Sequence, residues 1–238
     1  MEAGAVRRVN YLRYVKVVGT MHVSPESRER VVEEIRSWRP HAVALELDWS
    51  RFMGMQSGHR PGAGEAFRLG RSGALNYFLA KVEERLGEQF GMAPGEEMRA
   101  AAETAASMGA QIFLIDEDIR VILSKLLAAP LREKLMLALE SLSVFLPFAL
   151  SSEDFDPIGD YRIMMAEFRE RYSYIYRVLV EERNLLMALR IASIVEGLMG
   201  RGIRKPRIVA VVGLGHKPGL EHLLNGAISK VYNPLGGR

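Results

Sequence analysis

The sequence predicts an α/β fold, in which a mainly parallel central sheet is flanked by helices and carries an all-helical insertion. Four short apolar runs indicate the sheet, because each is rich in β-branched or aliphatic residues and ends at a glycine or an acidic residue. Continuous apolar runs of this kind are typical of parallel strands buried on both faces. The predicted strands cover residues 14–18, 42–47, 111–115 and 207–212.

Helical patterns separate the first three runs, so strand and helix alternate along the chain. Ser24-Pro25-Glu26 combines an N-cap residue, a proline for the first turn and an acid that suits the helix dipole. This helix should end near Trp38. A second helix is predicted over residues 95–108, with Gly109 as its stop.

The stretch from residue 119 to residue 200 interrupts this alternation, because its pattern is helical throughout. Helix breaks are predicted at Pro130, at Pro147 and near residues 156–159. We therefore predict one domain over residues 1–238 with a helical insertion at approximately 119–200. The apolar helices between residues 121 and 200 could bury a homodimer interface or pack on the sheet.

Composition excludes several classes of protein. The chain is 48% hydrophobic and 26% charged, which is typical of a soluble globular domain. Its net charge of +3 is small and dispersed, which argues against a nucleic-acid partner but leaves weak attraction to an anionic membrane surface open. The absence of cysteine excludes disulfides, thiolate metal sites and a cysteine nucleophile.

The sequence shows neither a signal-peptide pattern nor a membrane span. No apolar stretch reaches the roughly 18–20 residues that a spanning helix needs. The longest apolar stretch, over residues 135–150, contains Glu140 and Pro147 and is better explained as a buried or interfacial helix. We therefore expect a cytoplasmic protein or one that associates with a membrane surface.

Polar residues follow each of the four predicted strands. These segments are Gly19-Thr20-Met21-His22, Glu46-Leu47-Asp48 with Arg51 one turn later, Asp116-Glu117-Asp118, and Gly213-Leu214-Gly215-His216. In open α/β sheets, ligands bind in the crevice beyond the carboxyl ends of the strands. We therefore expect His22, Glu46 and His216 to meet in one polar crevice.

The Gly-x-x-His spacing is weak evidence when taken alone. With 22 glycines and 5 histidines, chance gives about 0.5 matches, and the chain has three. The match that ends at His222 lies in a predicted helix and is interpreted as an accident. The matches that end at His22 and His216 differ, because each follows a buried strand and leads through a proline into a helix.

Two imidazoles and a carboxylate form a donor set that suits a divalent metal. Zinc hydrolases commonly use two histidines and one glutamate, and the same ligands also suit manganese, cobalt or iron. The predicted ligands are His22, Glu46 and His216, with Glu46 acting as a ligand or as the general base. A metal would activate water. Without metal, Glu46 could orient one histidine, which would then act as general base on water.

Structural roles compete with these functional ones. Either histidine could be an ordinary hydrogen-bonding partner, and Glu46 could form a salt bridge with Arg51 or another arginine. Asp116 and Asp118 could cap helices or form ion pairs. Arg183 lies either on a solvated helix face or at the site. In the functional interpretation, Arg51 and Arg183 hold a substrate carboxylate by bidentate hydrogen bonds, and Asp116 also binds the substrate.

Six segments taken together resemble the TraB/PrgY family, including its archaeal members. They match in order over nearly the whole chain, from about residue 14 to residue 224. The segments are Gly19-Thr20-Met21-His22-Val23-Ser24, Glu46-Leu47-Asp48 with Arg51, Gly95-Glu96-Glu97-Met98, Leu114-Ile115-Asp116, Glu182-Arg183-Asn184, and residues 211–219, which contain Gly213-Leu214-Gly215-His216.

The resemblance implies a fold of the EreA/ChaN-like group and a relationship to the TIKI proteins. TIKI proteins are described as metal-dependent proteases that use two Gly-x-x-His motifs and a glutamate, which implies His22, His216 and Glu46 here. PrgY limits the activity of a secreted peptide pheromone. The same group contains a haem-binding protein and an esterase, so the fold does not determine the reaction.

The leading functional prediction is a peptidase-like, metal-dependent hydrolase that uses manganese, cobalt or zinc. The alternative is a non-catalytic regulatory protein that binds a peptide or a protein partner in the same crevice, at a membrane surface. A buried ionic network made by His22, Glu46 and His216 would favour this alternative. A third prediction is a metal-free esterase.

Overall fold

The computed structural model describes residues 9–20, 25–57, 95–136 and 159–228. The chain divides into two compact units. The first combines Met1–Ile119 with Arg183–Arg238, and the second is Arg120–Glu182. Every strand of the described residues belongs to the first unit.

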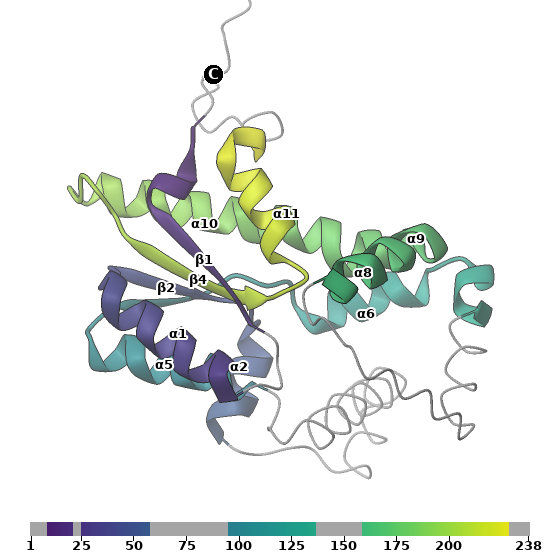
Figure 1. Cartoon of the computed structure of the whole chain (residues 1–238), viewed down its shortest axis with the longest axis horizontal. Coiled ribbons are helices and arrows are strands. Elements are labelled where there is room, and N and C mark those ends of the chain that lie inside the picture. Colours follow the sequence, from purple (N-terminus) through teal and green to yellow (C-terminus); the bar gives the residue numbers. More distant parts are fainter. Residues whose placement is uncertain (1–8, 21–24, 58–94, 137–158, 229–238) are drawn as a thin grey trace, which may run out of the picture. The chain divides into compact units, whose positions relative to one another are not determined.

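The first unit contains a four-stranded parallel sheet flanked by helices, which confirms the predicted α/β fold (Figure 1). Each predicted run overlaps one strand, and the ends of the two differ by at most two residues. The strands are β1 (Val15–Thr20), β2 (Ala42–Leu45), β3 (Gln111–Leu114) and β4 (Ile208–Gly213). β2 is shorter than predicted because the chain turns at Glu46, where Leu47 N donates to Leu45 O over 2.7 Å.

The last strand of the chain lies inside the sheet, since the strand order is β1-β4-β2-β3. β4 pairs in parallel with β1 and with β2, and Ile208 is in register with both Val15 and Ala42. All four strands are parallel, so their carboxyl ends lie together at one end of the sheet. The turn that follows β4 lies between the ends of β1 and β2.

Helices cover both faces of the sheet (Figure 1). One face packs against α1 and α5 through a core that includes Ile35, Leu45 and Met98. The other face packs against α10 and α11 through a core that includes Ile191 and Leu220. The helical segments of the first unit are η1 (Tyr11–Arg13), α1 (Pro25–Trp38), α2 (Trp49–Ser57), α5 (Glu96–Ser107), α10 (Glu182–Gly200), α11 (Lys217–His222) and η3 (Leu223–Ala227).

Of two predicted helix boundaries, one is confirmed and the other lies outside the described residues. The predicted stop of α5 is confirmed, since Gly109 adopts a φ of +69° directly after the helix. The predicted N-cap Ser24 lies outside the described residues, and α1 begins at Pro25.

Gly109→Ala is expected to lower the free energy of unfolding by about 1–2 kcal/mol, because an alanine in the left-handed region brings Cβ too close to the backbone. Gly197→Ala in α10 is the matched control, since its added Cβ meets nothing within 4 Å. That change should raise the free energy of unfolding by about 0.5–1 kcal/mol. Urea unfolding of both variants measures the difference, and equal signs for the two would contradict the assignment of the turn.

α10 is an amphipathic helix whose buried side covers the sheet. Met187, Ile191, Val195 and Leu198 recur at helical spacing and are buried. Asn184 lies on the same buried side, within the first turn of the helix. No helix among the described residues, α10 included, combines the length and the apolarity needed to cross a membrane.

The second unit is helical in its described part. Its small core combines Ala129, Tyr172 and Ile175. Glu133 accepts hydrogen bonds from the backbone N–H groups of Tyr174 and Ile175 at the start of α9, at 3.1 and 3.0 Å. Its helical segments are α6 (Ile119–Leu127), residues 131–136, α8 (Gly159–Arg171), α9 (Ser173–Tyr176) and η2 (Arg177–Glu181).

Of the three breaks predicted within the insertion, one is confirmed and two fall wholly or mostly outside the described residues. α6 ends at Leu127 and the next helix begins at residue 131, so the break at Pro130 is present. Pro147 and residues 156–158 lie outside the described residues. Arg183 and the residues of α10 that follow it belong to the first unit. The bounds of the predicted insertion, approximately 119–200, stay a prediction.

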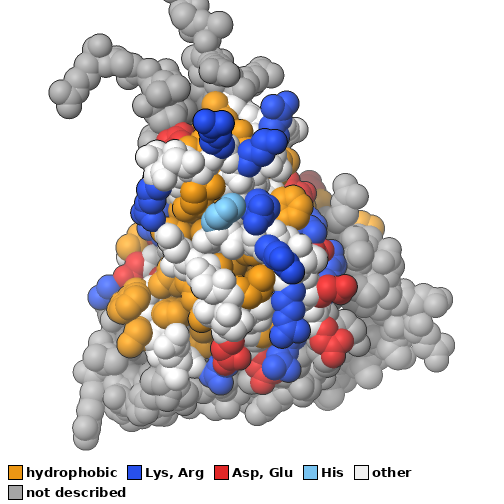
Figure 2. All heavy atoms as spheres, turned by 90° about the vertical axis from the view of Figure 1, so that its left-hand side faces the viewer, with side chains coloured by type: hydrophobic (Ala, Val, Ile, Leu, Met, Phe, Trp, Pro, Cys, Tyr) orange, Lys and Arg blue, Asp and Glu red, His pale blue; other side chains and the backbone are white. Residues whose placement is uncertain are grey.

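The end of the sheet at which the strands begin is basic. Figure 2 faces this end and shows lysine and arginine side chains gathered in a column. The Arg207 guanidinium donates two hydrogen bonds to the Arg39 carbonyl, at 3.0 and 2.8 Å, and both residues are exposed. Arg204 and Lys205 are exposed beside them in the chain. These charges and the polar residues that follow the strands lie at opposite ends of the sheet.

Candidate functional site

Glu46 is a buried carboxylate at the carboxyl end of β2, with 8% of its surface exposed. Its backbone N–H donates to Val211 O over 3.0 Å, which holds the residue beside β4. Its Oε2 accepts a hydrogen bond from Gly213 N over 2.6 Å. Its Oε1 accepts one from Arg183 Nη2 over 2.5 Å. The carboxylate is therefore fixed by the end of the neighbouring strand and by one cation.

His216 lies in the turn after β4, where its backbone N–H donates to Gly213 O over 2.9 Å. Its Nε2 is 3.2 Å from Glu46 Oε1. Its Nδ1 is 2.8 Å from Asn184 Oδ1, which is an acceptor. With the Asn184 amide in this orientation, Nδ1 carries a proton and Nε2 faces the carboxylate. In a neutral ring, Nε2 is then an acceptor that faces the acceptor oxygen of Glu46. A cation between these two atoms, either a proton or a metal ion, makes the contact favourable.

Close packing between α10 and α11 holds Asn184 against His216. A Cβ added at Gly219 would meet Asn184 Nδ2 and would lie 3.2 Å from its Cγ. Only a glycine at this position lets the amide approach α11 so closely. His222, three residues later, is exposed at the end of α11. The third Gly-x-x-His match therefore contains a glycine that supports His216.

Asp116 joins two arginines at the end of the sheet. Arg183 donates to it from Nε over 2.8 Å and from Nη2 over 2.7 Å, which is a bidentate pair. Arg51 Nη2 also donates to Asp116 Oδ2. Arg190 Nη1 donates to the Asp116 backbone carbonyl over 2.5 Å. Because Arg183 also contacts Glu46, one continuous ionic network connects the ends of β2 and β3.

Asp48 caps α2 and sets the position of Arg51. Its Oδ1 accepts from Ser50 N over 2.8 Å and from Arg51 N over 3.0 Å, as an N-cap carboxylate does. Its Oδ2 accepts from Arg51 Nε over 2.7 Å. The Glu-Leu-Asp segment therefore supplies one carboxylate to His216 and a second to the arginine that reaches Asp116.

The network lowers the pKa of two of its acids, Asp116 and Asp48. Burial alone would raise the pKa of Asp116, but the hydrogen bonds and charge of Arg183, with the charge of Arg51, outweigh burial and lower that pKa below its ordinary value. Burial would likewise raise the pKa of Asp48, yet hydrogen bonds from Ser50 and Arg51 lower it. The pKa of the Arg183 guanidinium is raised, because Asp116 and Glu46 outweigh the effect of its burial.

The free energy of unfolding is expected to fall as pH drops below about 4, because the lowered carboxyl pKa values make the folded state the weaker proton binder. The stabilisation is complete above the ordinary aspartate value of 3.8 and is lost as pH falls through the folded pKa. Urea unfolding from about pH 6 to about pH 2.5 measures this slope. Asp116→Asn should flatten it and Glu221→Gln, at the surface of α11, should not; equal slopes would contradict the assignment.

The structure brings together five of the predicted site residues and does not place the sixth. Glu46 contacts His216 and Arg183 directly. Asp116 is connected to the glutamate through Arg183, and Arg51 is connected through Asp116. His22 lies outside the described residues. Within the described ranges, no three histidine, aspartate or glutamate side chains are grouped to hold a metal ion. The metal site with His22 therefore stays a prediction.

Two structural alternatives from the sequence can now be resolved. Glu46 does form a salt bridge, and its partner is Arg183 rather than Arg51. A solvated position for Arg183 is wrong, since only 11% of its side chain is exposed.

Comparison with known proteins identifies the family. The model of the TraB/PrgY/gumN family matches residues 10–227, which include every site residue described above. The chain belongs to the TraB/PrgY/gumN family. The predicted resemblance is therefore confirmed.

Relatives of this TraB/PrgY/gumN domain occur in archaea and in mammals. The chain is 32% identical over 223 residues to "Uncharacterized protein MJ1365" of Methanocaldococcus jannaschii, covering 88% of this chain and 53% of that protein. It is 31% identical over 233 residues to proteins named "TraB domain-containing protein" in Mus musculus and Homo sapiens, covering 87% of this chain and 61% of each relative. The chain thus spans between half and two thirds of these relatives.

Asn184 and Arg190 of this TraB/PrgY/gumN domain were not among the predicted site residues. Asn184 is 6% exposed and contacts His216, whereas Arg190 contacts the Asp116 backbone. The signal for Asn184 was present in the sequence, because it is a polar residue in register with an apolar helical stripe. Arg190 carries no comparable signal, since a single exposed arginine on a helix is ordinary.

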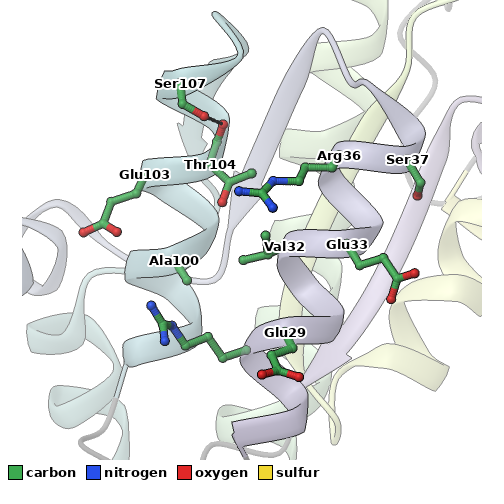
Figure 3. Close-up of a pocket in the computed structure, with 10 residues that line it drawn as sticks. Glu29, Val32, Glu33, Arg36, Ser37, Ala100, Glu103, Thr104 and Ser107 are labelled. Atoms are coloured by element: carbon green, nitrogen blue, oxygen red, sulfur yellow. Dashed lines mark hydrogen bonds between the residues drawn. The ribbon is translucent and has the colours of Figure 1, made fainter.

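A large groove in the described part of this TraB/PrgY/gumN domain lies away from the ionic network. It is a groove of about 910 Å³ between α1 and α5. Figure 3 shows Arg36 extending across it from α1, with Thr104 and Ser107 on α5 opposite. Glu29 and Glu103 also line it, so both signs of charge are present. Among the described residues, no lining residue of this groove is a hydrogen-bond or ion-pair partner of Glu46 or His216. We therefore place the candidate site at the carboxyl ends of the strands.

Proposed function

We propose that this family member is a metal-dependent hydrolase that acts on peptides, with His216 and Glu46 at its centre and His22 as a further metal ligand. One observation carries the proposal. Asn184 fixes His216 through Nδ1, and this directs Nε2 at the buried Glu46 carboxylate over 3.2 Å. Metal-binding histidines commonly donate their second N–H to such an acceptor.

The donor set is compatible with manganese, cobalt or zinc. An imidazole nitrogen and a carboxylate oxygen converge, and these ligand types suit all three ions. The Glu46 carboxylate has about four lone-pair positions, so it retains acceptor capacity beside Gly213 N and Arg183. A divalent ion held here would lower the pKa of a bound water and supply the nucleophile.

The two arginines take different roles in this proposal. Arg183 holds Glu46 and Asp116 in fixed positions, since it forms ion pairs with both carboxylates and both are buried. Arg51 is the arginine that reaches a substrate carboxylate, because 32% of its side chain is exposed. Asp116 accepts hydrogen bonds from both guanidinium groups and so holds Arg51 beside Arg183.

Elemental analysis of protein purified without added metal tests the proposal. Wild type should carry one divalent ion per chain, and His22→Ala, His216→Ala and Glu46→Gln should lose it. Hydrolysis of a peptide library should fall by about 10²–10⁴-fold in the same variants and in the presence of a chelator. His222→Ala is the matched control, because this exposed histidine has the same Gly-x-x-His spacing. It should keep both metal and activity.

Two outcomes would replace this proposal. Hydrolysis that survives chelators but not His216→Ala would identify a metal-free esterase or peptidase, with His216 as general base. Wild-type protein without metal and without hydrolysis, together with normally folded variants, would contradict both enzymatic alternatives.

The buried ionic network favours a second candidate function. Arg51 and Arg183 form ion pairs with three acids, Glu46, Asp48 and Asp116, within one cluster, and Glu46 also contacts His216. Such a network suits a regulatory protein that binds a peptide or protein partner at a membrane surface without catalysis. A partner that binds the metal-free protein, and binds His216→Ala equally well, would support it.

A further inference from the structure

One edge of the sheet is open among the described residues. β3 is the outermost strand, and β2 is its only strand partner there. Gln111 N donates to His41 O over 3.0 Å, and Ile115 N donates to Leu45 O over 2.9 Å. Backbone groups alternate in direction along a parallel strand, so the N–H and C=O groups of Ile112 and Leu114 point away from β2. They form a pairing edge for one more strand.

A trough runs beside this edge, between β3 and α10. It has a volume of about 390 Å³. Its floor is apolar and includes Phe113, Ile194 and Leu198. Its helix wall has small residues, since Ser193 is exposed and a Cβ added at Gly197 would meet nothing within 4 Å. A side chain of an added strand therefore has room next to the sheet.

Two arginines mark the ends of the trough. Arg201 Nη1 donates to Gln111 Oε1 over 3.2 Å where β3 begins, and Arg190 donates to the Asp116 carbonyl where the strand has ended. Both line the trough, and neither forms a salt bridge with an acid of the described residues. They are eleven residues apart along the helix, which corresponds to about 16 Å. Five residues of an extended strand span a similar length, about 16 Å.

We infer that this edge binds an extended peptide as an additional strand, and that the peptide carries acidic residues at both ends of the bound segment. Its backbone pairs with Ile112 and Leu114, and one apolar side chain enters the trough. The carboxylates of the acidic side chains at the two ends of the segment contact Arg190 and Arg201. This is recognition by strand addition, in which main-chain hydrogen bonds supply affinity and side-chain pockets supply specificity.

The same charges disfavour a second copy of this chain as the occupant. Two β3 edges paired about a two-fold axis would run antiparallel. Arg201 of one copy would then lie beside Arg190 of the other at each end of the pair. Like charges in such positions repel, and charged side chains on edge strands are a common barrier to self-pairing.

Peptide binding at this edge does not depend on the proposed function. Only the role of the bound peptide as a substrate rests on the proposed function. β3 leads directly to Asp116, which belongs to the candidate site. A peptide that follows β3 therefore has one end beside Arg190 and the ionic network. In the hydrolase, the trough would select acidic, extended peptides and direct them toward the site.

The binding test uses a fluorescein-labelled peptide with the sequence Glu-Thr-Val-Thr-Glu, acetylated and amidated. Because strand side chains alternate, both glutamates and the valine face the trough together. Fluorescence anisotropy is recorded with the Glu46→Gln protein in the presence of a chelator, so that the peptide is bound but not hydrolysed. The second probe is the same peptide with N-methyl groups on the amides that would pair with β3, and it should bind at least about tenfold more weakly.

Two protein variants test the trough and one controls for them. Gly197→Leu fills the trough from an exposed helix position, and Arg201→Glu reverses the charge where β3 begins. Each should weaken binding by at least about tenfold. Gly200→Leu adds the same side chain to the same helix outside the trough lining and should bind as the parent does.

Three results would overturn the inference. Equal binding of the N-methylated peptide would exclude strand addition, and unchanged binding by Gly197→Leu would place the peptide elsewhere. A dimer in sedimentation experiments that Gly197→Leu dissociates would make this edge a self-interface. Failure of hydrolysis with intact peptide binding would remove the proposed function alone, whereas hydrolysis without binding at this edge would remove this inference alone.

Discussion

Asp116→Ala is expected to lower the free energy of unfolding by about 3–5 kcal/mol, because it leaves two buried or half-buried arginines without their shared partner. Asp116 is 2% exposed and accepts hydrogen bonds from both Arg183 and Arg51. Removing one member of a buried ion pair costs more than the pair contributes, since the remaining charge stays desolvated. Urea unfolding at neutral pH, followed by circular dichroism, measures the loss.

Two further variants separate charge from packing at this position. Asp116→Asn keeps the volume and one acceptor oxygen but removes the charge, so its loss should be intermediate. Glu221→Ala removes an acid whose nearest basic nitrogen, on Lys217, is 3.8 Å away at the surface, and should cost less than about 1 kcal/mol. An Asp116→Ala protein as stable as Glu221→Ala would show that the arginines do not depend on Asp116.

Under the proposed function, Asn184→Leu is expected to reduce metal affinity, and with it hydrolysis, by about 10–100-fold, as losses of partners behind metal-binding histidines do. Leucine has a similar shape but no acceptor, so the Nδ1 proton of His216 loses its partner. Nitrogen NMR shifts of the His216 ring should report the proton on Nδ1 in wild type and a mixture of tautomers in the variant. This readout holds whether or not the protein is an enzyme.

Gly219→Ala reaches the same histidine by another route. The new Cβ would collide with the Asn184 amide, so the His216 tautomer should shift even though alanine favours a helix. Gly197→Ala in α10 is the control, because its Cβ has open space. An unchanged His216 spectrum in both Asn184→Leu and Gly219→Ala would contradict the role assigned to Asn184.

Local patterns were sufficient for the elements of the sheet but not for their order. Each strand could be predicted because a buried parallel strand is a continuous apolar run, a signal within five or six residues. Pairing of β4 with both β1 and β2 depends on contacts across almost the whole chain, which no local pattern contains. The sequence therefore predicted that Glu46 and His216 share an edge, but not that Gly213 N would hold the Glu46 carboxylate.

Arg183 shows why parts of the site could not be predicted. Its neighbours Glu181 and Glu182 give the local pattern of a solvated helix face, yet its side chain points to acids at the ends of two strands. Tertiary partners more than sixty residues away decide its environment. Asn184 was accessible in principle, because it interrupts an apolar stripe. The role of His22 stays a prediction.

The central position of β4 has a consequence for how the chain acquires its structure during synthesis. β1 emerges from the ribosome early, but its partner strand follows almost two hundred residues later, with Val15 paired to Ile208. Until then β1 has no neighbour, and β2 and β3 form an incomplete sheet with an apolar edge exposed. Long-range pairing of this kind slows folding. We expect nascent chains to need protection from aggregation until residue 213 is available, and the site at His216 to be assembled last.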